Sequence, residues 1–301
     1  MALSYKIFHV ISNSTKKENI TCDLFWRQLF QKYFGNFEET VGYVDVVGNG
    51  STFPSWKDAF FEYYKTAMKV EKNKKETGYE DYLVESIHNR DLIAVKVISL
   101  YEDFGDKNNC VILSIYKGDI EITKFLLKRC NMEKRDFDKA LEEASINGEL
   151  EIMKEIFEMG AEIDNKEYPP NEFEPIFYAS SFGYTEIVRL LLEKGANPRV
   201  KNDYPLVRAA RGGYTEIVKL LIDAGCDPSS RDNEALVKSA KKGHTKVVRL
   251  LLQDSRVDPT ARKRQAQKWA TINQHEEIIK LLLQDRRMKK AHHALVSHCP
   301  F

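Results

Sequence analysis

The side chains best suited to metal chemistry lie near the end of the 301-residue chain, in the string "HHALVSHC". It contains His292, His293, His298 and Cys299, and imidazole nitrogens and thiolates are the ligands that zinc prefers. Nothing on either flank would fix a coordination geometry, and a solvated chain end accounts for the same residues. We therefore interpret residues 289–301 as a basic, flexible tail and expect no metal site there.

Catalytic patterns elsewhere in the chain are incomplete. The string "GNGSTF" from Gly48 has two glycines of a dinucleotide-binding turn, but Phe53 stands where the third glycine belongs. The histidine of "QHEEII", His275, occupies a turn position that recurs along the chain and is interpreted as a turn residue rather than a base. P-loop, G-x-S-x-G and H-E-x-x-H strings do not occur. We expect a protein that is not an enzyme and that uses no cofactor.

The chain spells one stretch nearly identically at a spacing of 30 residues: "GYTEIVRLLLEKGANP" from Gly183 and "GYTEIVKLLIDAGCDP" from Gly213. A third version, "GHTKVVRLLLQDSRVDP", begins at Gly243. The apolar residues in each copy fall at spacings of one, three and four, which predicts an amphipathic helix. A pair of small residues shortly before each glycine, such as Ala179 and Ser180, lets a preceding helix pack closely. The repeating unit is therefore predicted to be a tight helix pair.

One helix pair cannot hide its apolar faces, so stacked copies are required to bury a continuous core. Alignment on the turn between the two helices extends the repeat in both directions and predicts seven pairs over residues 79–288. The outer two turns have lost their glycine, as terminal repeats tend to do. The longest spacing holds the insertion "EIDNKEYPPNEFEP", which we predict to be a protruding loop. The seven turn positions are Arg90, Gly118, Gly148, Gly183, Gly213, Gly243 and Gln274.

The repeat resembles the ankyrin repeat in its small-residue pair, its Gly-His or Gly-Tyr turn, its apolar second helix and its Gly-Ala-Asn or Gly-Cys-Asp exit. The resemblance implies an all-α ankyrin-repeat solenoid of about seven helix pairs, with short hairpin fingers because the period is 30 rather than 33. The family's Thr-Pro-Leu-His start is reduced, for example to Tyr204-Pro205-Leu206-Val207. Arrays of this period are similar to those of amoebae and of the large DNA viruses that infect them. A viral source would imply a role in host–pathogen interaction.

The first 78 residues are rich in aromatic residues and lack the regular spacing of the repeats, and they predict a small helical module. Apolar and aromatic residues lie at helical spacing in "DLFWRQLFQKYFG" from Asp23 and in "PSWKDAFFEYYKTAMK" from Pro54. Trp-Arg-x-Leu-Phe followed by Ser-Trp-Lys resembles the region downstream of an F-box, which implies binding to the Skp-type adaptor of a cullin ubiquitin ligase. The first F-box helices have no clear counterpart in residues 1–78. The alternative is a helical cap that covers the exposed end of the repeat stack.

Composition places the chain among intracellular proteins without a membrane span. The formal net charge is +1, and no apolar run approaches the roughly 18 residues that a membrane span needs. The five cysteines are odd in number and include no C-x-x-C pair, which indicates reduced thiols. We expect a monomer in the cytoplasm, or in the host cytoplasm if the source is viral.

The repeat register also identifies candidate contact residues. The resemblance to ankyrin repeats implies that the first helices line a concave surface, on which residues that neither pack nor cap can meet a partner. Aromatic and basic side chains gather at these positions, a composition typical of interaction hot spots. The candidate partner-binding residues are Tyr178, Phe182, Arg208, Arg211, Lys238, Lys241, Lys242 and Trp269.

Charge is distributed unevenly along the array. Residues 133–174 contain 14 acidic and 5 basic residues, whereas residues 238–290 contain 15 basic and 5 acidic residues. The two ends should therefore attract different partners, and the basic end favours an acidic protein segment. Nucleic acid is disfavoured, because the basic string "ARKRQAQK" lacks a wider basic face with interleaved aromatics.

These observations predict a non-catalytic scaffold that presents a repeat surface to a protein partner. The alternative is a substrate-recruiting subunit of a cullin-type ubiquitin ligase, in which residues 1–78 hold the Skp-type adaptor and residues 79–288 hold the target. An enzyme with an unrecognised site at its N-terminus is the third hypothesis.

Overall fold

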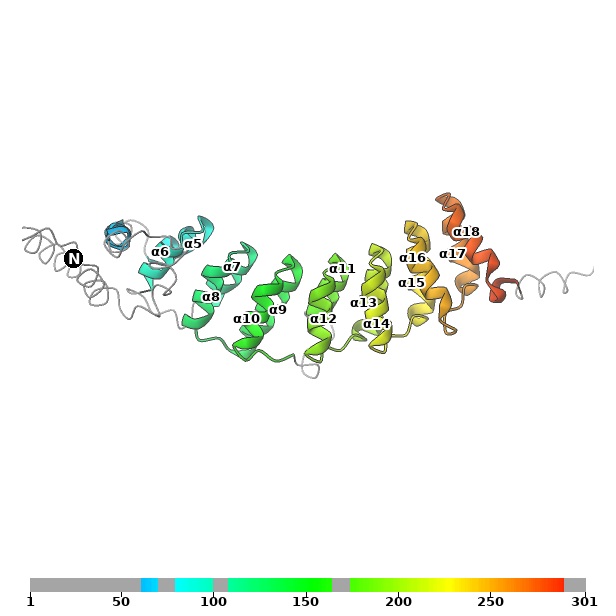
Figure 1. Cartoon of the computed structure of the whole chain (residues 1–301), viewed down its shortest axis with the longest axis horizontal. Helices are drawn as coiled ribbons and strands as arrows, with labels where there is room; N and C mark the ends of the chain where they lie inside the picture. The colour runs from blue at the N-terminus through cyan, green and yellow to red at the C-terminus, as the bar shows by residue number, and fades with distance from the viewer. Residues whose placement is uncertain (1–60, 70–78, 100–107, 164–173, 290–301) are drawn as a thin grey trace, which may run out of the picture. The chain divides into compact units, whose positions relative to one another are not determined.

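The computed structural model describes residues 61–69, 79–99, 108–163 and 174–289 (Figure 1). Within these ranges every regular element is an α-helix, and no residue lies in a β-strand. The chain forms two compact units, Met1–Met132 and Glu133–Phe301.

The helices follow one another as short pairs in both units. The first unit contains helical residues 61–69 and α5 (Tyr79–His88), α6 (Leu92–Ile98), α7 (Asn108–Tyr116) and α8 (Ile120–Arg129). The second unit begins with α9 (Lys134–Asn147), α10 (Leu150–Glu158), α11 (Pro175–Phe182) and α12 (Thr185–Glu193). It continues with α13 (Val200–Gly212), α14 (Thr215–Asp223), α15 (Ser230–Lys242), α16 (Thr245–Gln253), α17 (Ala261–Ile272) and α18 (Glu276–Gln284).

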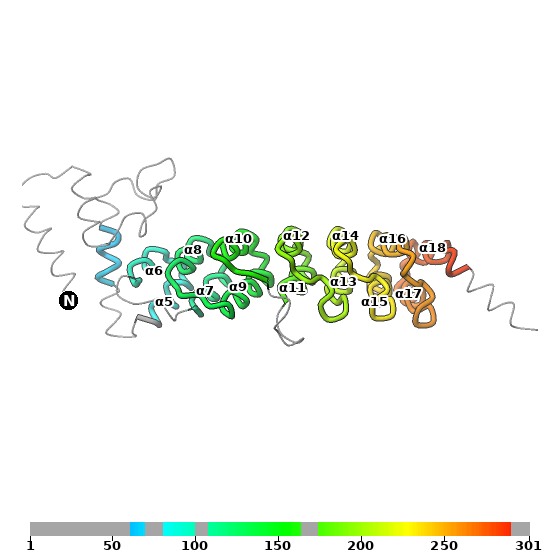
Figure 2. Tube along the Cα trace, turned by 90° about the horizontal axis from the view of Figure 1, so that it is seen from below, coloured from blue at the N-terminus to red at the C-terminus, as the bar shows by residue number. Residues whose placement is uncertain are grey.

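In the second unit the helices form two layers. The first helices of the pairs, α9, α11, α13, α15 and α17, contact one another in chain order, and so do the second helices α10, α12, α14, α16 and α18. Figure 2 shows these two rows. In the first unit α5 contacts α7 and α6 contacts α8 in the same manner. The described part of the chain thus contains the seven predicted helix pairs, and the all-α repeat fold is confirmed.

All seven predicted turn positions have positive φ, which confirms the repeat register. The values run from 56° at Arg90 to 88° at Gly183, and the two positions without glycine, Arg90 and Gln274, adopt the same left-handed conformation as the other five. This conformation ends the first helix of each pair and reverses the chain into the second.

A ring from the next repeat covers the turn glycine in the second unit. A Cβ atom added to Gly183 would lie 2.5 Å from Cε1 of Tyr214, and one added to Gly213 would lie 2.6 Å from Nδ1 of His244. The other ring nitrogen of His244, Nε2, donates to the carbonyl oxygen of Arg211 at 2.9 Å. The Gly-Tyr and Gly-His dipeptides therefore join neighbouring repeats: the ring is supplied by one repeat and the space for it by the glycine of the repeat before.

The helices α13, α15 and α17 each contain a left-handed turn near their start, where a hairpin finger was expected. Three consecutive residues in each turn have φ between 50° and 60°. These turns are Lys201–Asp203, Arg231–Asn233 and Arg262–Arg264. Asparagine and aspartate tolerate this conformation better than other non-glycine residues, and the first two turns use them at two of three positions. The short period of the repeat is accommodated by this turn.

The core of the second unit lies between the two helix layers. The small residues Ala179, Ser180, Ala209 and Ala210 are fully buried, which confirms the close approach of the first helices. Equivalent leucines on the second helices, including Leu221, are fully buried as well, and each stabilises the fold by about 1.5–3 kcal/mol.

Three cysteines of the described ranges, Cys110, Cys130 and Cys226, are buried free thiols. Burial raises the pKa of Cys226 to about 12, with the nearby Asp203 carboxylate adding to the rise. The thiol of Cys226 donates to the carbonyl oxygen of Pro198 at 3.3 Å. It is therefore protonated and unreactive at neutral pH.

Several predicted features lie outside the described residues. These are most of the N-terminal module in residues 1–60, the central part of the insertion in residues 164–173, and the histidine- and cysteine-bearing tail in residues 290–301. The predictions made for them stay predictions, and so do the domain boundaries at residues 78 and 288.

Candidate functional site

The eight candidate contact residues all lie on first helices of the second unit. Tyr178 and Phe182 belong to α11, Arg208 and Arg211 to α13, the three lysines to α15, and Trp269 to α17. We call the surface formed by these residues the first-helix face. Adjacent first helices contact one another, so side chains from neighbouring helices can meet on this face.

Lys241 and Trp269 are brought together directly. The Nζ atom of Lys241 lies 3.7 Å from the centroid of the Trp269 ring, although 28 residues separate the two positions in the sequence. Lys241 is exposed and Trp269 is half-buried. A cation over an indole ring at an exposed site contributes about 0.5–1 kcal/mol and fixes the orientation of both groups. The pair presents a charge and an aromatic edge together.

Arg208 is held against α11 by two contacts. Its Nε donates to Oγ of Ser181 at 3.1 Å, and its guanidinium carbon lies 5.6 Å from the centroid of the Phe177 ring. These contacts restrain a long side chain that would otherwise lose rotamer freedom on binding a partner.

Sequence reasoning missed an aromatic stack next to Arg208. The rings of Phe177 and Tyr204 are stacked with centroids 5.6 Å apart, and the guanidinium of Arg231 lies 4.6 Å from the centroid of Tyr204. Lys201 adds a second cation, 5.5 Å from the centroid of Phe177. Lys201 and Arg231 begin left-handed turns, so their approach to the rings depends on a backbone conformation that the sequence pattern did not reveal. The one sequence feature that could have indicated this stack is the presence of aromatic residues at Phe177 and Tyr204.

The remaining candidates are less closely associated. Lys238 forms an ion pair with Glu234 at 3.4 Å within α15. Phe182 is 49% exposed, and its ring centroid lies 6.2 Å from that of Tyr184. The side chains of Arg211 and Lys242 are exposed. The face therefore has two restrained clusters, one around Arg208 and one at Lys241 and Trp269, with exposed charges between them.

Tyr178 points to the acidic end of the face. Its hydroxyl interacts with the carboxylate of Glu142 on α9, which lies beside Glu143. Burial raises the pKa of Glu142 to about 7, Glu143 adds to the rise, and the hydrogen bond from Tyr178 opposes it. Glu142 is therefore partly protonated near neutral pH.

Charge on the first helices changes sign along the second unit. Helix α9 contributes Glu142 and Glu143, whereas α13 and α15 contribute the five basic candidates. An elongated partner would therefore meet an acidic end and a basic end in a fixed order, which favours one orientation of binding.

The side chains on this face are suited to non-covalent binding. In the described ranges, no group of three or more histidine, cysteine, aspartate or glutamate side chains could hold a metal ion. What the face supplies is aromatic surface, hydrogen-bond donors and restrained cations, the features that dominate protein interfaces.

Comparison with known proteins agrees with the geometry. A family model that represents three copies of the ankyrin repeat matches the chain at residues 144–232 and 206–292. No curated protein matches the chain. Residues 144–292 thus contain ankyrin repeats, and the all-helical structure is an ankyrin-repeat solenoid. Ankyrin repeats indicate a protein–protein interaction scaffold.

In the part of the chain that the structure describes, no helix is long and apolar enough to cross a membrane.

Proposed function

We propose that the protein is a non-catalytic scaffold whose first-helix face binds an acidic segment of a protein partner. The observation that carries this proposal is the Lys241–Trp269 pair, because it holds a cation and an aromatic ring in one exposed, restrained arrangement. The restrained Arg208 and the exposed Lys242 extend the same basic surface. Function then depends on rigid presentation of side chains by packed helices.

The experiment is comparative capture from a eukaryotic lysate with three forms of the full chain. The first is the wild type, and the second carries Lys241→Glu and Trp269→Ala. The third carries Lys219→Glu, which changes the net charge by the same amount at an exposed residue of α14. The proposal requires proteins that the wild type and the third form retain and that the second form loses. Identical retention by all three forms would contradict it.

The alternative function rests on residues 1–78, whose Trp-Arg-x-Leu-Phe and Ser-Trp-Lys strings favour binding to a Skp-type ligase adaptor. On this hypothesis the repeats recruit the substrate of a cullin-type ubiquitin ligase. Capture with the full chain and with a chain that begins at Gly78 separates the two functions, provided that both show the same thermal unfolding of the repeats. Adaptor and cullin retained only by the full chain would identify a ligase receptor.

A further inference from the structure

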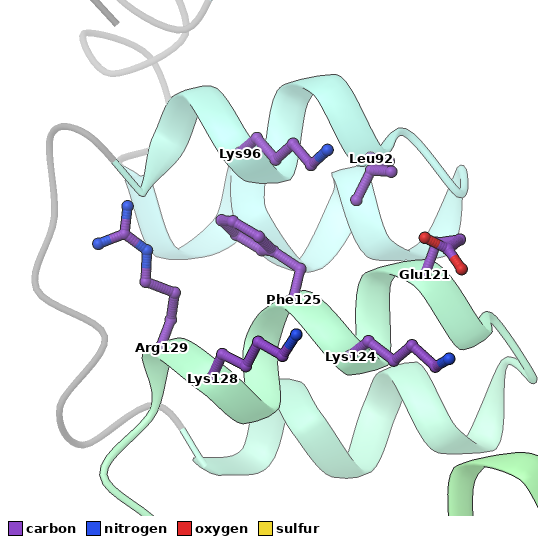
Figure 3. Close-up of a pocket in the computed structure, with 7 residues that line it drawn as sticks. All are labelled: Leu92, Lys96, Glu121, Lys124, Phe125, Lys128 and Arg129. Carbon is purple, nitrogen blue, oxygen red and sulfur yellow. The ribbon is translucent and has the colours of Figure 1, made fainter. Parts of the chain in front are cut away.

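A groove of about 550 Å³ lies on α6 and α8, the second helices of the first two described repeats (Figure 3). Both helices belong to the unit Met1–Met132, and they contact each other. The volume lies in the range that encloses a small ligand or a few residues of a peptide. This groove is distinct in sequence and in helix layer from the first-helix face.

Cations line both walls of this groove. Lys96 comes from α6, whereas Lys124, Lys128 and Arg129 come from α8 (Figure 3). Lys96 is buried, and Lys128 and Arg129 are exposed. Neither Lys128 nor Arg129 forms an ion pair with a carboxylate of the described residues, and the guanidinium of Arg129 lies over the Phe125 ring at 5.8 Å from its centroid. Their charges are therefore available to a ligand.

The base of the groove is apolar. In Figure 3 the Phe125 ring lies between Lys96 of α6 and Lys128 of α8, and Leu92 lies further along α6. The core-facing side of α8 is formed by the buried Ile122, Leu126 and Leu127, whereas Phe125 is only half-buried. A groove of this composition would attract anionic groups to its walls and an apolar group to its base.

We propose that this groove binds an acidic peptide segment of a partner protein, in which aspartates or glutamates flank one aromatic or large aliphatic residue. The carboxylates pair with the exposed Lys128 and Arg129, and the apolar side chain packs on Phe125. Among the described residues that line the groove, cations outnumber carboxylates, and the exposed Lys128 and Arg129 make it complementary to an anion.

A peptide fits better than a nucleic acid for two reasons. Nucleic-acid binding relies on a stripe of cations that follows a run of phosphates, whereas these four cations surround one groove with Glu121 at one end (Figure 3). The single aromatic ring at the base also offers little platform for successive bases.

The test measures fluorescence anisotropy of a fluorescein-labelled peptide, EDEFEDE, titrated with the full chain. We expect Lys128→Glu with Arg129→Glu to weaken binding at least about tenfold. The matched control, Lys219→Glu with Lys246→Glu on α14 and α16, changes the net charge equally and should leave affinity within about twofold. If thermal unfolding shows that the double reversal disturbs the fold, Lys128→Gln with Arg129→Gln replaces it.

Two further arms test the apolar base and the class of ligand. Peptide EDEGEDE should bind the wild type more weakly than EDEFEDE, and Phe125→Ala should remove that difference. Equal loss of affinity in the groove variant and the control variant would overturn the proposal, since it would show attraction to net charge alone. Tighter groove-dependent binding of tripolyphosphate or of a twelve-nucleotide thymidine strand than of EDEFEDE would also overturn it.

Discussion

At the level of single residues, the turn between paired helices requires positive φ, and in some repeats it also requires space for the ring of a neighbouring repeat. Gly243 has φ 83°, and a Cβ atom there would lie 2.8 Å from Cε1 of His275. Gln274 occupies the equivalent turn of the last described pair with φ 58°, and no further pair follows it in the described residues. Glycine is therefore essential where a ring covers the turn, and merely favourable where none does.

Substitutions at these two positions should have opposite effects. Gly243→Ala should lower the free energy of unfolding by at least about 1–2 kcal/mol, because alanine would be strained at positive φ and would meet the His275 ring. Gln274→Gly should raise it by up to about 1 kcal/mol by relieving the same backbone strain. Urea unfolding measures both. Destabilisation by Gln274→Gly would show that the turn is not held as described.

Glu142 gives a pH dependence at the same scale. Its pKa rises from 4.5 to about 7 on folding, mainly through burial. Between these values the native chain retains a proton that the unfolded chain has released, so this residue lowers stability as pH rises. Glu142→Gln should therefore flatten the fall in stability between pH 4.5 and 7.

Thermal unfolding across that pH window checks this prediction. Glu158→Gln, at an exposed position of α10, serves as the control and should leave the pH dependence unchanged. If Glu142→Gln and Glu158→Gln give the same pH profile, the carboxylate of Glu142 is not buried as the structure has it.

At the level of elements, the end of the array is held by one side chain. Arg287, which follows α18, donates from Nη1 to the carbonyl oxygens of Asp254 and Val257 and from Nη2 to that of Leu252, at 2.6–3.0 Å. Its guanidinium also pairs with Asp285 at 2.7 Å. These contacts satisfy carbonyl groups at the end of α16 and in the loop that follows it. The last two pairs are thereby joined.

Arg287→Ala should lower the free energy of unfolding by about 1–3 kcal/mol, because several half-buried carbonyl groups lose a charged donor. Arg256 provides the control, since it makes the same local pair with Asp254 at 2.7 Å but is exposed. Arg256→Ala should cost less than about 1 kcal/mol. Urea unfolding of both variants decides the point, and equal effects would contradict the clamping role of Arg287.

Across the whole molecule, the parts that sequence could predict are those set by local spacing. The apolar face of α12, the small pair Ala179 and Ser180, and the turn at Gly183 lie within fifteen residues of one another, so one repeat is enough to recognise them. Seven copies then fix the register, including the turns at Arg90 and Gln274 that lack glycine.

The parts that sequence could not predict depend on contacts between repeats or on unusual backbone. Register placed Arg208 on the face, but its partners Ser181 and Phe177 belong to the preceding repeat and require particular rotamers. The turn at Arg262–Arg264 contains no asparagine, aspartate or glycine, so nothing in its composition indicates left-handed residues. The turns that begin at Lys201 and Arg231 do contain asparagine and aspartate, but the contacts of these two cations with Phe177 and Tyr204 join neighbouring repeats, which local spacing does not reveal.

The repeat register decides which side chains reach the first-helix face, and two leucines in α14 test it most directly. Leu221 is fully buried, whereas its neighbour Leu220 is half-buried. Urea unfolding of Leu221→Ala should show a loss of about 2–5 kcal/mol, and Leu220→Ala should show a clearly smaller loss. Equal losses, or a greater loss at Leu220, would contradict the register and with it the proposed binding face.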